Sequence, residues 1–279
     1  LLRKQLQMNS ILKKKHLIHI TGCGSVPGIG NVMLNYADEK FDEINRIEVG
    51  FAWDSNMKVF VVPFSIESIL EEFTMYAKYI HNKKLKTIKP IDSVVNVYHR
   101  SIGREKDFKC GHHPEVYTFY RFAKKKGIKD IAFYAGFPEH SRKVIQMLVD
   151  LGFARDKKVK INRAEIWSDE FLTELLKDLG YPKGYKETEN LWVWIIGKHL
   201  GKRKEILMEC IVPPSKGWEW AGCNIDTGMP ASIIAQMIFK GIINKPGSHS
   251  PEFIVPPTLF FKELRKRKML VYENGKVIN

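Results

Sequence analysis

A glycine-rich segment near the N-terminus has residue types that could bring the backbone close to a bound phosphate or ring. It runs from Gly22 to Asn31, with glycines at 22, 24, 28 and 30 and Pro27 inside it. Between a strand and a helix, such glycines let backbone N–H groups approach a dinucleotide pyrophosphate. The spacing G-x-G-x-x-x-G-x-G is not the G-x-G-x-x-G fingerprint, however, and Pro27 removes an N–H that a phosphate would use. We therefore expect the segment to line a site without holding a pyrophosphate.

The same segment allows a second interpretation, a short-chain dehydrogenase. From Gly24 to Gly30 it has the spacing of that family's T-G-x-x-x-G-x-G loop, and Tyr120 with Lys124 forms a Y-x-x-x-K pair. Cys23 replaces the threonine of that loop, however, and no acidic residue ends a second strand about 20 positions further on. An aromatic core stripe also accounts for Tyr120, so the short-chain dehydrogenase remains an alternative.

The four cysteines give no indication of a metal site. Cys23, Cys110, Cys210 and Cys223 contain no C-x-x-C pair. The run from Cys110 to His113 has metal-ligand residue types, but a closed site would need a second cluster at suitable spacing. We expect free thiols, no metal, and a cytoplasmic protein, because no secretory pattern opens the chain.

The formal net charge of +14 does not by itself indicate a nucleic-acid partner. The lysines are scattered along the chain, and most lie at the ends of predicted helices, where they complement the helix dipole. A nucleic-acid surface would place basic and stacking aromatic side chains on one face. The longest apolar run, 191–196, is far shorter than the roughly 20 residues that span a bilayer. We expect no nucleic-acid partner and no membrane partner.

Hydrophobic periodicity predicts a mixture of helices and strands. Helices are expected at 2–14, 28–37, 65–73, 114–126, 138–152, 168–179, 230–240 and 257–268. Strands are expected at 16–21, 43–53, 58–62, within 85–99, at 130–136, 191–199 and 205–212, and in a terminal hairpin at 271–278, while 101–113 is expected to be a mobile loop. The hairpins imply antiparallel pairing, so the fold class is α/β (α+β) with a mixed, largely antiparallel sheet.

Four segments in the same order resemble the saccharopine dehydrogenase-like family, which includes the lysine 6-dehydrogenases and carboxynorspermidine dehydrogenases. Gly22–Asn31 is similar to its G-x-G-x-x-P-G-x-x-N segment, and Ser65–Phe73 to its S-x-x-x-L-x-E-(Y/F) helix. Gly136–His140 with the helix ending at Gly152 resembles its G-x-x-x-H segment, and Asp226–Ser232 followed by Pro251 and Glu252 resembles the T-G-x-P-A helix and closing turn. Together these segments cover nearly the whole chain.

The resemblance implies an NAD(P)-dependent hydride transfer at a C–N bond of an amino acid or imine substrate. The NAD or NADP cofactor would be bound mainly by a Rossmann domain that is not in this chain, which starts without a methionine. The implied domains are 1–40 (end of the nucleotide-binding domain and crossover), 41–215 (substrate binding and dimerisation) and 216–279 (C-terminal helices returning to the nucleotide-binding domain). The implied substrate- or cofactor-lining residues are Gly22, Gly24, Pro27, Gly28, Asn31, His140, Thr227, Gly228 and Pro230.

Several features leave the activity open, and no catalytic residue is assigned. Further polar candidates are His99, Arg100, Arg104, His112 and His113. The strand Ile131–Ala135 has no charge, although relatives often carry a basic residue there. A non-catalytic dimerisation or ligand-binding descendant of the domain is therefore the main alternative. We expect a homodimer through the sheet at 190–212, where the alternating Trp192 and Trp194 share one face.

Overall fold

The computed structural model describes residues 2–111 and 113–279, with the side chains of Leu2 and Arg3 excepted. His112, one of the polar candidates above, lies outside the described residues. Among the described residues, no helix is long and apolar enough to cross a membrane.

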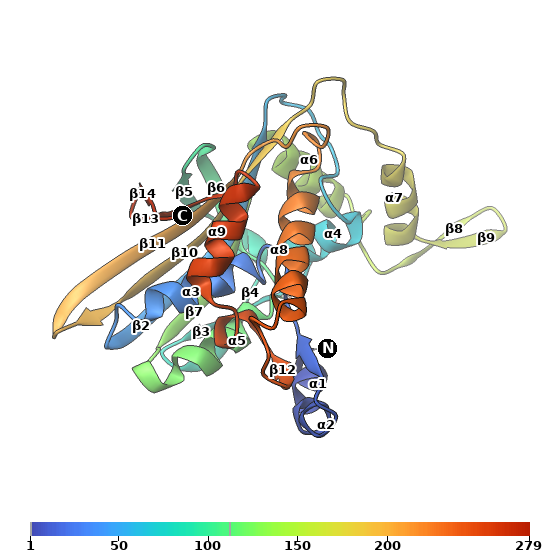
Figure 1. The fold of residues 1–279 in the computed structure, drawn as a ribbon. Coiled ribbons are helices and arrows are strands. Elements are labelled where there is room, and N and C mark those ends of the chain that lie inside the picture. The colour runs from blue at the N-terminus through green and yellow to red at the C-terminus, as the bar shows by residue number, and fades with distance from the viewer. Residues whose placement is uncertain (1, 112) are drawn as a thin grey trace.

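One large, curved sheet of ten strands forms the centre of the molecule (Figure 1). Its long strands are β2 (Glu43–Ser55), β10 (Glu187–His199) and β11 (Lys202–Val212). These three strands pair antiparallel, and Leu200 and Gly201 turn β10 into β11 with positive φ angles. Strand β2 also pairs with β7 (Asp130–Phe137), and this is the one parallel pairing among the described strands of the sheet. The predicted mixed, largely antiparallel sheet is confirmed.

The remaining elements complete this sheet or cover it. Its other strands are β3 (Ala77–His81), β4 (Lys84–Ile88), β5 (Val95–His99), β6 (Gly103–Lys109), β13 (Leu270–Glu273) and β14 (Lys276–Val277). The helices are α1 (Leu2–Gln7), α2 (Asn9–Lys14), α3 (Ile29–Asp38), α4 (Ile66–Thr74), α5 (Glu115–Ala123), α6 (Glu139–Asp150), α7 (Ser168–Lys177), α8 (Gly222–Phe239) and α9 (Pro257–Lys266). Small sheets are made by β1 (Ile18–Ile20) with β12 (Gly247–His249), and by β8 (Lys158–Ile161) with β9 (Ala164–Trp167).

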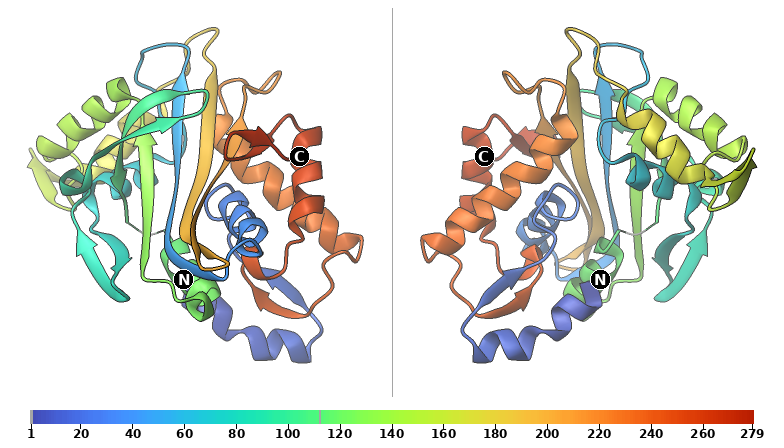
Figure 2. Two further views of the ribbon diagram at one scale, coloured as in Figure 1. Left: turned by 90° about the vertical axis from the view of Figure 1, so that its left-hand side faces the viewer. Right: turned by 90° about the vertical axis from the view of Figure 1, so that its right-hand side faces the viewer.

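The two faces of the sheet differ because side chains alternate along each strand. Val49, Phe51 and Trp53 of β2 are buried in the main core beneath the helices. The other face carries Trp192 and Tyr134, which form a separate small cluster. In Figure 2, α3, α8 and α9 lie to one lateral side of the central strands and α6 to the other, and buried residues of all four helices belong to the main core.

The first and last parts of the chain pack together. Strand β1 pairs in parallel with β12, joining Ile18–Ile20 to Gly247–His249. Asn9 adds a contact from α2, since its side-chain oxygen accepts the Ser248 backbone N–H at 3.0 Å. At the C-terminal end, β13 joins the main sheet beside β11, and its turn to β14 has positive φ at Asn274 and Gly275, as the predicted hairpin requires.

Three predictions about local structure are wrong. The chain at 58–62 is irregular, and the expected loop at 101–113 contains β6, which pairs with β5 and β7. A polar, charged strand such as Gly103–Lys109 gives no hydrophobic alternation, so only its neighbours identify it. The third error is the helix expected at 230–240, which begins at Gly222 instead.

The early start of α8 has a tertiary cause. The Glu187 carboxylate on β10 accepts the Gly222 backbone N–H at 3.0 Å and so satisfies a donor at the first helical residue. Pro230 consequently lies inside the helix rather than at its first turn. A proline near the start of a periodic segment normally indicates a helix N-terminus, and here a distant glutamate determines the start.

Candidate functional site

The glycine segment forms a loop that is closed by its own hydrogen bonds. The Gly24 N–H donates to the Pro27 carbonyl at 2.8 Å, and the Ile29 N–H donates back to the Gly24 carbonyl at 3.0 Å. Gly28 has φ 145°, and a Cβ there would lie 1.8 Å from the Gly24 oxygen, so only glycine fits. Because these N–H groups already have partners within the chain, the loop does not fit a pyrophosphate.

Asn31 fastens this loop to the C-terminal part of the chain. Its side-chain oxygen accepts the Gly28 N–H at 2.8 Å, and its side-chain nitrogen donates to Glu252 at 2.8 Å. Asn31 and Glu252 are each 1% exposed. Burial raises the pKa of Glu252, against the opposing effect of the Asn31 hydrogen bond. Within this chain Asn31 therefore holds the loop in place, and its amide is not presented to a surface.

The structure brings Thr227 against the loop. A Cβ at Gly24 would lie 3.3 Å from the Thr227 methyl group, so Gly24 leaves room for the helix to approach. Thr227 donates its hydroxyl to the Cys223 carbonyl one turn back, at 2.8 Å. We name this contact between Gly22–Asn31 and Thr227 the loop–helix junction.

Thr227 and Gly228 do not precede a helix, as the helix expected at 230–240 would require. Both residues lie within α8, where N–H groups bond along the helix. Thr227 and Gly228 are exposed beside the loop, whereas Pro230 is buried. The surface of the junction is therefore made by the loop and by exposed side chains of α8.

His140 is not part of this junction. It is the second residue of α6, whose buried residues share the main core with those of α8. Its Nε2 atom is buried and has no hydrogen-bond partner among the described residues. His140 therefore comes from a different helix than Thr227, although the resemblance grouped the two residues together.

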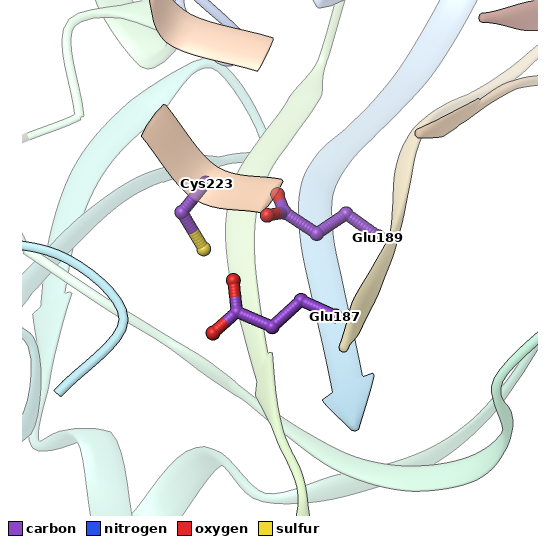
Figure 3. A group of neighbouring side chains, drawn as sticks. All are labelled: Glu187, Glu189 and Cys223. Atoms are coloured by element: carbon purple, nitrogen blue, oxygen red, sulfur yellow. The ribbon is translucent and has the colours of Figure 1, made fainter. Parts of the chain in front are cut away.

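A cluster of buried acidic side chains lies one turn from the junction, and the sequence gave no reason to group them. Glu187 and Glu189, two residues apart on β10, converge on Cys223 in the first turn of α8 (Figure 3). Their carboxylate oxygens and the Cys223 Sγ all lie within 4.8 Å of one another. Asp226, one helical turn after Cys223, is 1% exposed and faces Glu189.

The environment of this cluster favours protonated groups. Burial, and then the neighbouring Glu189, raise the pKa of Glu187 to about 8. Glu187 nevertheless accepts the Tyr185 hydroxyl at 3.0 Å as well as the Gly222 N–H. Burial also raises the pKa of Cys223 and of Asp226 well above their usual values. The spacings E-x-E and C-x-x-D could have suggested the two halves, but only the fold brings them together.

A groove of about 400 Å³ lies on the other face of the sheet. Its lining includes Tyr134, Trp192, Trp194, Leu207 and His99. His99 is 2% exposed and pairs with the fully buried Asp107 at 2.9 Å. The groove therefore combines an aromatic surface with a buried histidine–aspartate pair.

The other polar candidates from the sequence are held within the chain or are exposed. Arg100 donates to Glu209 at 3.0 Å. His113 stacks on Phe133 with 3.4 Å between ring centroids, and lies 3.7 Å from both Glu72 and Glu115. Arg104 is exposed on β6. None of these contacts involves a residue of the loop–helix junction.

These features define a mixed α/β domain on one large, mainly antiparallel sheet, with a glycine loop closed against α8. The sheet contradicts the short-chain dehydrogenase alternative, which requires a doubly wound parallel sheet. The chain belongs to the saccharopine dehydrogenase C-terminal domain family, which matches residues 24–270. It is thus a domain of an oxidoreductase family, as the motif resemblance implied.

The fold is similar to that of a solved yeast enzyme. The structure titled apo histidine-tagged saccharopine dehydrogenase (L-Glu forming), from Saccharomyces cerevisiae, matches with a TM-score of 0.75 and 12% sequence identity. The match covers 98% of this chain and 77% of that chain. At this identity the likeness shows the fold alone.

Proposed function

We propose that the chain is the substrate-binding and dimerisation part of an NAD(P)-dependent oxidoreductase that acts on a C–N bond of an amino acid or imine. The observation that carries the proposal is the family match over residues 24–270, together with a glycine loop that faces the exposed part of α8. The nicotinamide cofactor would supply the hydride chemistry, and residues outside these 279 would bind most of the dinucleotide.

The loop–helix junction is the surface that we assign to the substrate and the reacting end of the cofactor. Gly22, Gly24, Pro27 and Gly28 would present a backbone surface without bulky side chains, which allows close approach. Thr227 and Gly228 would form the facing wall. Asn31 and Pro230 act from beneath this surface, because both are buried.

A direct test measures nucleotide binding by this chain alone and by the same chain joined to a nucleotide-binding domain. We expect no saturable NADPH or NADH fluorescence change for the chain alone at roughly micromolar concentrations, and binding for the joined form. The joined form should then reduce NAD(P)⁺ with some member of a panel of α-amino acids. Micromolar nucleotide binding by the chain alone would contradict the assignment of the cofactor to other residues.

A non-catalytic descendant of the domain is a second candidate, and one observation favours it. Strand β7 has no charge between Ile131 and Ala135, where a cation could otherwise hold a substrate carboxylate. If this candidate is correct, the joined form would bind nucleotide but turn over none of the amino acids tested. A substitution of Thr227 by Val would then leave nucleotide binding unchanged.

We also propose a homodimer through the face of the sheet that carries the groove. Trp194 and Leu207 are half-buried there beside the aromatic cluster, so a second copy could cover apolar area that is exposed in one chain. Trp194→Asp should weaken dimerisation at least about tenfold, since it places a charge in an apolar interface. Phe239→Asp is the matched control, because Phe239 is 92% exposed on α8. A monomeric wild-type chain at tens of micromolar in light scattering would refute the dimer.

The free thiols support a proposal for the cellular location. All four cysteines are free in the structure, which fits a reducing compartment, and we propose the cytoplasm.

A further inference from the structure

The cluster of Glu187, Glu189 and Cys223 has few polar partners for three buried acidic groups. Glu187 has two donors, the Tyr185 hydroxyl and the Gly222 N–H. Glu189 is 1% exposed and interacts with the Asp226 carboxyl and the Cys223 thiol, and its Oε1 atom has no other hydrogen-bond partner among the described residues. A buried carboxylate either takes up a proton or is paired with a cation or a metal ion. Among the described residues, no lysine, arginine or histidine forms an ion pair with Glu187 or Glu189.

A fourth residue points into the same place. Asp226 is 1% exposed and lies against the Glu189 carboxyl, and its Oδ2 atom has no other hydrogen-bond partner among the described residues. Its other oxygen receives only a 3.3 Å contact from the Thr227 hydroxyl. Because Asp226 follows Cys223 by one helical turn, both side chains extend from the same side of α8 toward β10.

The two carboxylates approach the backbone closely at the point where these side chains converge, as only a glycine allows. A Cβ on Gly222 would lie 2.8 Å from Glu189 Oε1 and 3.2 Å from Glu187 Oε2. Oxygens of both carboxylates therefore lie beside a residue that has no side chain. Figure 3 shows the two carboxylates and the Cys223 sulfur directed toward one another. Small rotations of these side chains would bring all three donor atoms to one centre.

We propose that Glu187, Glu189 and Cys223 bind one divalent metal ion of the zinc class, with Asp226 holding Glu189 in position from behind. A thiolate together with carboxylates suits zinc, whose bonds to oxygen and sulfur are about 2.0–2.3 Å long. Calcium and magnesium prefer ligand sets made only of oxygen. Binding forms one metal–sulfur and two metal–oxygen bonds, and the thiol proton and any protons held by the two carboxyl groups leave to solvent.

Such an ion would tie the start of α8 to the start of β10. Cys223 lies one turn before Thr227, so the ion would fix the helix end that meets the glycine loop. The proposal concerns the stability and position of this helix, and it does not depend on the oxidoreductase activity. It differs from the expectation of no metal that the cysteine spacing gave, because the ligands come from segments more than thirty residues apart.

The test uses the purified chain, with zinc and cobalt as probes. After zinc loading and removal of free metal, elemental analysis should give about one zinc per chain, and a chelator should lower the melting temperature. Cobalt(II) loading should produce a thiolate-to-cobalt charge-transfer band. Cys223→Ser should abolish that band. Cys23→Ser is the matched control and should retain it, since Cys23 is the half-exposed thiol at which adventitious metal would bind.

A second variant keeps the proposal testable if Cys223→Ser fails to fold. Asp226→Asn should weaken zinc binding about 10- to 100-fold, as the loss of a partner behind a metal ligand does, while circular dichroism stays unchanged. Wild-type chain that binds less than half an equivalent of zinc at saturation would overturn the proposal. So would a cobalt–thiolate band that survives in Cys223→Ser or disappears in Cys23→Ser.

Discussion

Asn31 allows a sharp test of whether the glycine segment is held by the core or serves mainly as a ligand surface. We predict that Asn31→Ala destabilises the chain by about 3–5 kcal/mol. The substitution leaves two buried groups without partners, the Gly28 N–H and an oxygen of Glu252. Each unpaired buried group costs roughly 1–3 kcal/mol, and a charged group costs more.

The same helix supplies a matched control. Asn35 lies one turn after Asn31 on α3, and its side chain donates to the Val255 carbonyl at 3.2 Å from a half-buried position. Asn35→Ala removes the same atoms and gains the same helix propensity, but it leaves no fully buried charged group. Its expected cost is about 0.5–1.5 kcal/mol.

The measurement is urea denaturation of the three chains at neutral pH, followed by circular dichroism. A double mutant that combines Asn31→Ala with Glu252→Gln should show a coupling of roughly 0.5–3 kcal/mol, because the two residues share one hydrogen bond. The assignment of Asn31 to the core is refuted if the destabilisation by Asn31→Ala exceeds that by Asn35→Ala by less than about 1 kcal/mol. A loss of substrate affinity without a loss of stability would instead make Asn31 a ligand contact.

Three further predictions concern other parts of the chain. Gly24→Ala should cost about 1–2 kcal/mol of unfolding free energy, and Thr227→Ser should recover much of that cost, because it removes the methyl group 3.3 Å from the new Cβ. If the free-energy changes of the two substitutions add fully in the double mutant, the contact is contradicted. Burial, and then nearby carboxylates, raise the pKa of Glu105 from 4.5 to about 7, so the folded state is penalised increasingly between these pH values. Glu105→Gln should therefore stabilise the chain by about 1 kcal/mol at pH 8, after discounting for partial exposure, and should have no effect near pH 4; equal effects at both pH values would refute this. His99→Ala should cost about 3 kcal/mol, because it leaves a buried aspartate unpaired. His81→Ala should cost under about 1 kcal/mol, because its 2.8 Å pair with an aspartate is exposed. Similar melting temperatures for the two variants would show that burial does not set the strength of the pair.

The sequence predicted those parts of the fold whose signals are local. Helix α4 follows from its apolar spacing and from Ser65, whose hydroxyl accepts the Ser68 N–H as a helix cap. The β10–β11 hairpin follows from its long apolar strands, and the terminal hairpin from Asn274 and Gly275. Strand β6 could not be predicted, because its polar residues show no hydrophobic alternation. Only its pairing with β7 in the folded chain identifies it as a strand.

The candidate site divides in the same way. The glycine segment was evident because a closed loop with a positive φ requires glycine, and the type and order of its residues carry the family resemblance. Whether its N–H groups were free for a phosphate depended on the fold, which uses them within the loop. His140 and Thr227 were grouped by resemblance, and the structure places them on different helices, α6 and α8.

The sequence by itself determined the fold class, the glycine loop and the family, because each depends on the type, order and spacing of residues along the chain. The tertiary structure alone decided where α8 begins and which acidic groups share one buried space. Glu187 reaches the first turn of α8 across 35 residues and caps it, and in doing so it places two carboxylates beside Cys223. Such contacts form because buried donors and charges must find partners in three dimensions, and sequence periodicity contains no record of that requirement.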